Sequence, residues 1–260
     1  MGSIKKAFDL TGRNALVTGG SRGLGLQIAE ALGELGARIV ISSRKAPDLE
    51  KAQAHLAGLG VKAEWIAADN SRDEDVNRLA DETIKKLGRV DILVNNAGAT
   101  WGAPFDEFPA SAWDKILDLN LKAPFFLTRA LLPLLEAAGT QDDPARVINV
   151  GSIDGLHVPS LPVYSYAPSK AGLHHLTRML AREFGPRHIT VNAVAPGPFE
   201  SKMMAATLAA AGDAIAASAP LRRIGRPDDM AGVAIYLCSR AGAYVTGAVI
   251  PVDGGIATTV

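Results

Sequence analysis

Short apolar runs alternate with longer helical patterns along almost the whole chain, and this alternation restricts the folds that it can adopt. Residues 14–17, 38–41, 63–67, 90–94, 146–150, 190–194 and 249–252 are predicted to be strands. Helices are predicted at residues 24–35, 48–59, 73–87, 111–138 and 164–184. Strands separated by helices of this length form right-handed βαβ units, in which helices cover both faces of a parallel sheet. The sequence therefore predicts a doubly wound α/β fold with about seven parallel strands.

Size and composition indicate one globular domain over residues 1–260, of which 48% are hydrophobic and 21% charged. Lys plus Arg equal Asp plus Glu at 27 each, so we expect no nucleic-acid or membrane partner. We expect no metal site, because no His/Cys cluster has metal-ligand spacing. The single cysteine, Cys238, lies in an apolar run and is expected to be buried. One cysteine and no signal-peptide pattern predict a cytoplasmic protein.

Residues 200–220 depart from this alternation. The segment is rich in alanine, and its apolar points are Met203, Met204, Leu208 and Ile215. It follows the sixth predicted strand, at the edge where ligands of doubly wound sheets bind. We interpret it either as a mobile, lid-like helical segment over the substrate or as a pair of surface helices packed on the core.

A glycine-rich loop, Thr18-Gly19-Gly20-Ser21-Arg22-Gly23-Leu24-Gly25, follows the first predicted strand and opens a helix. Glycines allow a tight turn and a close approach of the backbone to a diphosphate. The helix N-terminus offers unpaired N–H groups and the positive end of its dipole to the phosphates. The loop therefore predicts a dinucleotide site, although a plain strand-to-helix turn would also contain glycine.

The end of the second predicted strand is expected to meet the adenosine ribose of such a dinucleotide. NAD enzymes usually present a carboxylate there to hold the 2′-hydroxyl. This chain has Ser42, Ser43, Arg44 and Lys45 instead, so no acid in this stretch repels a 2′-phosphate. Arg44 could clamp that phosphate and Arg22 could add a second cation. We therefore predict NADP(H) rather than NAD(H), unless these are ordinary solvated charges.

Tyr166 and Lys170 are four residues apart and would share one face of a helix. A nearby ammonium lowers the pKa of a phenol from its ordinary value of about 10. The pair therefore suits proton transfer to or from a carbonyl oxygen, although the spacing alone also fits a chance surface pair. Tyr164 is six residues before Lys170 and should point to another side of the helix.

Together these motifs resemble those of the short-chain dehydrogenase/reductase family, over essentially the whole chain. In order, they are residues 18–25, Asn95-Asn96-Ala97-Gly98, Asn120, Ser152, Tyr166-x-x-x-Lys170 and Pro196-Gly197. Within the family, the pattern is most similar to that of bacterial 3-oxoacyl-acyl-carrier-protein reductases. The resemblance implies a Rossmann fold, reduction of a carbonyl compound by NADPH, and a homotetramer with residues 111–138 and 164–184 at its dimer face.

The resemblance also implies a role for each catalytic residue. Tyr166 would protonate the carbonyl oxygen during reduction, and Ser152 would hydrogen-bond the same oxygen. Lys170 would hold the nicotinamide ribose and lower the pKa of the phenol. Asn120 would anchor a water that passes protons through Lys170. Each residue alone also has a simpler explanation, since Asn120 could distort its helix and Ser152 could cap a turn.

The coenzyme contacts implied by the resemblance come from several segments. Asp69 and Asn70 would meet the adenine, and Phe199 and Ser201 the nicotinamide amide. The complete predicted set is Gly19, Ser21, Arg22, Gly23, Leu24, Gly25, Ser43, Arg44, Asp69, Asn70, Asn96, Ala97, Gly98, Tyr166, Lys170, Pro196, Gly197, Phe199 and Ser201.

The substrate remains open at this point. Fourteen positions separate Ser152 from Tyr166, one more than the family commonly has, so the loop at residues 154–162 should reshape the substrate pocket. The primary prediction is a ketone reductase of the 3-oxoacyl type. A polyol or sugar-acid dehydrogenase of the gluconate type is the alternative enzyme, and a non-catalytic NADP-binding sensor is the alternative from another class.

Overall fold

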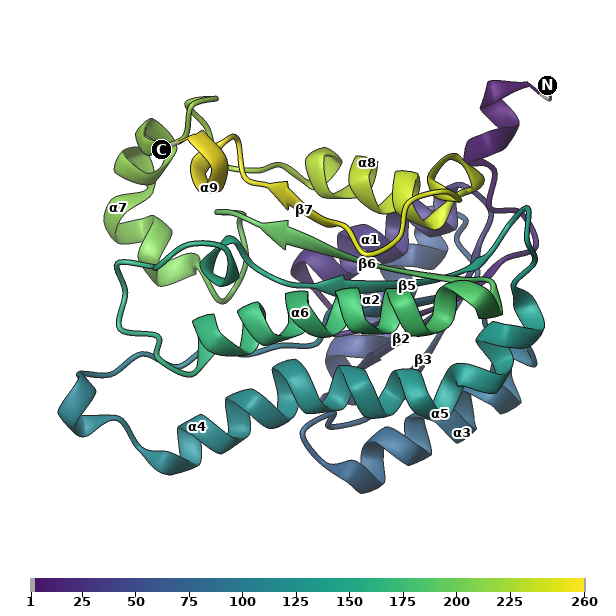
Figure 1. The fold of residues 1–260 in the computed structure, drawn as a ribbon, viewed down its shortest axis with the longest axis horizontal. Coiled ribbons are helices and arrows are strands. Elements are labelled where there is room, and N and C mark those ends of the chain that lie inside the picture. The colour runs from purple at the N-terminus through teal and green to yellow at the C-terminus, as the bar shows by residue number, and fades with distance from the viewer. Residues whose placement is uncertain (1–2, 260) are drawn as a thin grey trace.

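Seven parallel strands form the centre of the fold, in the order β3-β2-β1-β4-β5-β6-β7 (Figure 1). The computed structural model describes residues 3–259. The strands are β1 (Asn14–Thr18), β2 (Arg38–Ser43), β3 (Ala63–Ala67), β4 (Ile92–Asn95), β5 (Ala145–Val150), β6 (Ile189–Pro196) and β7 (Val249–Val252). The chain builds outward from β1 to β3 and then returns to place β4 on the other side of β1. This reversal leaves the crevice in which ligands of doubly wound sheets bind, and the predicted fold is confirmed.

Side chains of the strands alternate between two helical layers, as the two-residue period of a strand requires. In β1, Ala15 and Val17 face one buried cluster, whereas Leu16 faces the other. Leu16 pairs with Val40 and Leu93 in register, and these partners face the same side. Both faces of the sheet are therefore buried, which is why the strands are continuous hydrophobic runs in the sequence.

Helices cover both faces of the sheet (Figure 1). One layer contains α1 (Gly23–Glu34), α2 (Ala46–Gly58) and α8 (Pro227–Cys238). The other contains α3 (Asp73–Leu87), α4 (Ala110–Leu117), α5 (Ala123–Ala138) and α6 (Tyr166–Phe184). Two further helices, α7 (Ala205–Ser218) and α9 (Ile256–Thr259), lie near each other beyond the sheet edge. Short 3-10 turns are η1 (Ile4–Phe8), η2 (Phe105–Glu107), η4 (Ile153–Gly155), η5 (Gly185–Arg187) and η6 (Arg240–Gly242).

Three helices differ from the sequence prediction. The helix predicted at residues 111–138 is interrupted by a π-helical turn, η3 (Asp118–Lys122), which separates α4 from α5. The helix predicted from residue 164 begins at Tyr166. The sequence analysis missed α8, although Pro227 at its start and the acidic Asp228 and Asp229 in its first turn are recognisable helix-start signals.

The segment predicted to be a lid contains α7, which has no buried residue and is kinked at Ala211. It is thus attached to the core by few side chains, which is compatible with either interpretation of residues 200–220. Cys238 is 4% exposed, as predicted, and burial raises the pKa of its thiol to about 12. Within residues 3–259, no helix has the length and apolar character needed to cross a membrane.

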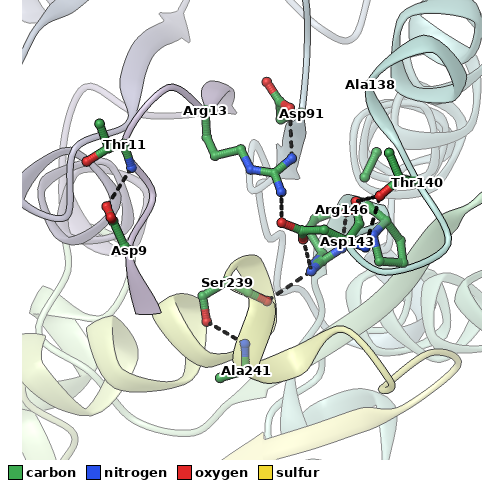
Figure 2. A network of polar contacts seen from close by, with 12 residues as sticks. Asp9, Thr11, Arg13, Asp91, Ala138, Thr140, Asp143, Arg146, Ser239 and Ala241 are labelled. Atoms are coloured by element: carbon green, nitrogen blue, oxygen red, sulfur yellow. Dashed lines mark hydrogen bonds and ion pairs between the residues drawn. The ribbon is translucent and has the colours of Figure 1, made fainter. Parts of the chain in front are cut away.

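A charged network ties together the amino-terminal ends of β1, β4 and β5 (Figure 2). Arg13 donates to the Asp91 carboxylate over 2.9 Å and is also paired with Asp143. Arg146, only 1% exposed, donates to Asp143 over 2.9 Å and to the Ser239 carbonyl oxygen over 3.0 Å. This network lies at the sheet edge opposite the carboxyl ends of the strands, so its role is to hold the fold.

We predict that Asp91→Ala lowers the free energy of unfolding by about 3 kcal/mol, because removing one partner leaves charged groups uncompensated. The Asp91 side chain is fully buried and accepts bonds from Arg13, Arg89 and the Asn14 N–H. Urea unfolding at matched protein concentration measures the change. The control is Glu74→Ala, whose side chain is 89% exposed, and we expect a change of about 0.5 kcal/mol or less. Equal effects of the two substitutions would contradict the prediction.

Candidate active site

The four predicted catalytic residues lie at the carboxyl edge of the sheet, around the start of α6. Tyr166 is the first residue of α6, and Lys170 lies one turn further along. Ser152 follows the end of β5 by two residues, and Asn120 occupies the π-helical turn between α4 and α5. Residues distant in sequence therefore converge on one place because consecutive parallel strands end at the same edge.

The ammonium of Lys170 is buried beside Tyr166. The Lys170 side chain donates from Nζ to the Val150 carbonyl oxygen over 2.8 Å, and the residue is 4% exposed. Its Nζ is 5.6 Å from the centroid of the Tyr166 ring. Burial lowers the pKa of Lys170 to about 8, because an apolar environment disfavours the charged ammonium.

The pKa of Tyr166 shifts in the opposite direction from the sequence prediction. Burial of the phenol, reinforced by the charge of Asp154, raises this pKa to about 12, although a hydrogen bond with Ser152 opposes the shift. The helical spacing correctly predicts that Lys170 is near, but it carries no information on desolvation. In the structure the loss of water around the phenol outweighs the stabilisation of its charged form.

Asn120 joins three segments of the site. Its side-chain Nδ2 donates to the Ala99 carbonyl oxygen over 2.9 Å and to Ser169 Oγ over 3.0 Å. Its Oδ1 accepts from the Ala99 N–H over 3.0 Å. Ser169 in turn donates to the Tyr166 carbonyl oxygen over 2.6 Å. The asparagine therefore does distort its helix, and the same contacts fix the loop after β4 against the first turn of α6.

Gly98 leaves space next to two side chains of the predicted catalytic set. A Cβ at this position would lie 3.3 Å from Asn120 Oδ1 and 3.5 Å from Lys170 Nζ. The loop after β4, Asn120 and Lys170 are thus close together, as a proton path through them requires. Ser152 Oγ accepts from the Asp154 N–H over 3.1 Å, so Ser152 does cap the η4 turn, and its own proton is not used by that bond.

The glycine-rich loop has the shape that a diphosphate requires. Gly19 and Gly23 adopt φ of 65° and 54°, which favour glycine over other residues. A Cβ at Gly25 would clash with the Asn96 amide, which donates to the Thr18 carbonyl oxygen over 2.8 Å. The loop therefore packs tightly against the segment after β4.

The N-terminus of α1 receives no hydrogen bond from a capping side chain, so its N–H groups remain available to a phosphate. A Cβ built on Gly23 would lie 3.8 Å from Ser201 Cβ. The segment after β6 that contains Ser201, which is predicted to bind the nicotinamide, therefore lies next to the glycine-rich loop. Leu24 is partly buried and packs against the hydrophobic core. The glycine-rich loop and the free N–H groups of α1 are therefore compatible with a bound dinucleotide.

The adenosine end contains an acid that the sequence analysis did not anticipate. Arg22 Nη1 lies 3.4 Å from Asp48 Oδ2 in the first turn of α2, whereas Arg44 is exposed. Ser21 donates to Ser43 Oγ over 3.0 Å, so the loop and the end of β2 are in contact as predicted. A 2′-phosphate would therefore meet Arg44 directly and would compete with Asp48 for Arg22.

The other predicted coenzyme residues lie along the same edge. Asp69 accepts hydrogen bonds from Ser71, and the Asn70 side-chain oxygen is buried without a hydrogen-bond partner in the described residues. An unpaired buried oxygen at this point suits a donor such as the adenine amine. The Ala97 N–H donates to Thr18 Oγ1 over 3.0 Å, a contact that the sequence analysis missed.

The predicted nicotinamide segment follows β6, which ends at Pro196. The Gly197 N–H donates to the Val252 carbonyl oxygen over 3.0 Å, and this joins the segment to β7. Phe199 is 3% exposed, its ring packs against Gly225, and the two residues form a β-bridge, so the Phe199 side chain belongs to the core. Ser201 Oγ accepts from the Met204 N–H over 3.2 Å.

Comparison with known proteins gives extensive matches. A family model described as enoyl-(acyl carrier protein) reductase matches residues 19–257. A 3-oxoacyl-[acyl-carrier-protein] reductase of rhamnolipid biosynthesis in Pseudomonas aeruginosa is 47% identical over 250 residues, which are 95% of this chain and 97% of that protein. Gluconate 5-dehydrogenase of Gluconobacter oxydans is 32% identical, with 96% of both proteins covered. A solved structure, the Pseudomonas aeruginosa RhlG/NADP active-site complex, has a TM-score of 0.93 and 46% identity, covering 97% of this chain and 99% of that one.

The buried ammonium leads to a prediction about pH. Because the pKa of Lys170 is about 8 when folded and near 10.5 when unfolded, the unfolded chain binds the extra proton between these values. The contribution of Lys170 to stability therefore rises with pH from about 8 to about 10.5. Against Lys170→Met, which cannot titrate, the wild-type protein should gain about 1–3 kcal/mol of unfolding free energy over this interval. Urea unfolding of both proteins between pH 7 and 10.5 measures the difference, and a constant difference would refute the burial of the charge.

Proposed function

This chain belongs to the short-chain dehydrogenase/reductase family, and we propose that it uses NADPH to reduce the ketone of a 3-oxoacyl compound to a secondary alcohol. It is an oxidoreductase with a nicotinamide dinucleotide as coenzyme. The observation that carries the proposal is the cluster of Ser152, Tyr166 and the buried Lys170 ammonium at the same sheet edge as the glycine-rich loop.

The chemistry follows from these positions. The bound coenzyme supplies hydride to the carbonyl carbon. Ser152 and Tyr166 donate hydrogen bonds to the carbonyl oxygen and oppose the negative charge that develops there. The Asp154 N–H occupies a lone pair of Ser152 Oγ, which leaves the hydroxyl proton for the substrate. Tyr166 then gives its proton to the oxygen.

The shifted pKa values set the protonation states of the two groups at neutral pH. With a pKa of about 12, Tyr166 holds its proton at neutral pH and can act as an acid. Lys170, with a pKa of about 8, remains largely charged at neutral pH and stabilises the phenolate that forms when the proton leaves. A Tyr166 base for alcohol oxidation would need the deprotonated form, which burial disfavours.

NADP(H) is the coenzyme in this proposal. Arg44, the residue after β2, is exposed and free of an ion pair in the part of the chain described, and Arg22 lies in the glycine-rich loop, next to Ser21, which contacts Ser43. Both can meet a 2′-phosphate, and Arg is the side chain best suited to bind one. Similarity to a protein solved with NADP supports the same choice.

Two alternatives remain beside this function. A sugar-acid dehydrogenase of the gluconate type is supported by the relative in Gluconobacter oxydans. A non-catalytic NADP-binding sensor would need only the coenzyme residues, whereas this chain also brings Ser152, Tyr166 and Lys170 together.

The same proposal includes a cytoplasmic homotetramer with residues 200–220 as a lid over the substrate. A single buried cysteine, which excludes internal disulfides, supports the compartment. Family analogy supports the assembly through α5 and α6, and the unburied α7 supports the lid.

The proposed acid is tested by Tyr166→Phe. The change removes the proton donor but little volume, so turnover should fall by about 10²–10⁴-fold while NADPH still binds. Consumption of NADPH at 340 nm with acetoacetyl and longer 3-oxoacyl esters measures turnover, and fluorescence titration measures binding. The matched control is Tyr164→Phe, because Tyr164 precedes α6 and packs edge-on against Phe105 and Phe108. Wild-type protein that binds NADPH but reduces no ketone and oxidises neither gluconate nor other alcohols would identify the sensor instead.

The coenzyme preference is tested by Arg44→Ala. Loss of the guanidinium should raise KM for NADPH by about tenfold or more and leave KM for NADH nearly unchanged, since only NADPH carries the 2′-phosphate. Lys51→Ala on the same helical layer is the control for a general loss of positive charge. A wild-type protein that prefers NADH would overturn the choice of NADP(H).

A further inference from the structure

The turn that follows Ser152 carries a carboxylate, that of Asp154, two residues beyond the proposed catalytic serine. In η4 (Ile153–Gly155), the Asp154 N–H donates to Ser152 Oγ over 3.1 Å. The turn is fixed on α6, because a Cβ at Gly155 would lie 2.7 Å from the Lys170 carbonyl carbon and the Ala171 nitrogen. The Asp154 backbone is therefore held beside the Ser152 hydroxyl, which donates to the substrate oxygen in the proposed function.

The Asp154 carboxylate is neither solvated like a surface acid nor neutralised by a partner. The residue is half-buried, and no hydrogen bond to its carboxylate oxygens and no ion pair is found among residues 3–259. Burial raises its pKa, and His157 is the one group that acts in the other direction. Lys170, the cation of the cluster, donates instead to the Val150 carbonyl oxygen.

The charge of Asp154 acts inside the site, since it contributes to the raised pKa of the Tyr166 phenol. The other ionisable groups around that phenol and the turn are His157, Lys170 and His174. A part-buried charge is poorly screened by salt and strongly disfavours a second charge of the same sign nearby. A substituent on the reacting carbon lies within reach of this field, because Ser152 and Tyr166 hold the oxygen of the same carbon.

We propose that Asp154 is a specificity-determining residue that excludes substrates with a carboxylate near the reacting ketone. The inference rests on the proposed function and narrows its substrate class to neutral 3-oxoacyl esters and thioesters, in which the acid is masked. Free 3-oxo acids and sugar acids carry the same sign of charge as Asp154 and are rejected. This repulsion also separates the proposed function from its gluconate-type alternative.

The test compares two substrates that present the same ketone, one as a neutral ester and one as a carboxylate. Ethyl acetoacetate and acetoacetate present the same ketone, and kcat/KM with NADPH is measured for each at pH 8, well above the ordinary titration of aspartate. The wild-type protein should prefer the ester. In Asp154→Asn, which keeps the shape and removes the charge, the ester-to-acid ratio should fall by about tenfold, chiefly through a lower KM for acetoacetate.

Two further variants keep the result interpretable. Asp154→Glu retains the charge and should retain the preference for the ester. Asp106→Asn makes the same chemical change at an exposed carboxylate in η2 and should leave the ratio unchanged. An unchanged ratio in Asp154→Asn would overturn the inference alone. A wild-type protein that reduces neither compound, nor any other neutral ketone, would overturn the proposed function and this inference with it.

Discussion

The hydrogen bond from Lys170 to the Val150 carbonyl oxygen determines much of the site. It joins the buried ammonium to the last residue of β5 and thereby holds the first turns of α6 against the end of that strand. A buried charge needs a partner of this kind, because removing it from water is otherwise too unfavourable. Tyr166 and Ser152 lie at the same edge of the sheet as this ammonium. Asn120 adjoins them through its hydrogen bond to Ser169 in the first turn of α6. The proposed chemistry thus depends on one cation, the Lys170 ammonium, which a strand of the sheet holds in place.

The strands and most helices could be predicted because their residues carry a local signal. Apolar runs such as β1 and β4 are buried on both faces of the sheet, and Gly19 marks the end of β1. The π-helical turn at Asn120 could not be predicted from periodicity, since its cause is a contact with Ala99 twenty-one residues earlier. The helix α8 could have been predicted, because Pro227 and Asp229 at its start are local signals.

The proximity of Lys170 and Tyr166 was easier to predict than their electrostatics. Spacing places Lys170 near Tyr166, and the structure agrees, but the sign of the phenol shift depends on how much water the fold removes. Likewise, the stretch after β2 contains no acid, whereas Asp48 reaches Arg22 from the next helix. The pKa shifts and ion pairs of charged groups can therefore be inferred only from the three-dimensional structure, because their energies depend on all neighbours and on burial.

The helix α7 shows how the absence of buried residues affects tolerance to substitution. Since none of its side chains belongs to the core, substitutions within residues 205–218 change the folding free energy little. The charged network at the opposite edge is the reverse case, in which Arg146 and Asp91 tolerate little change. Substitutions in α7 can therefore change what this segment contacts at little cost to folding, while the scaffold stays the same.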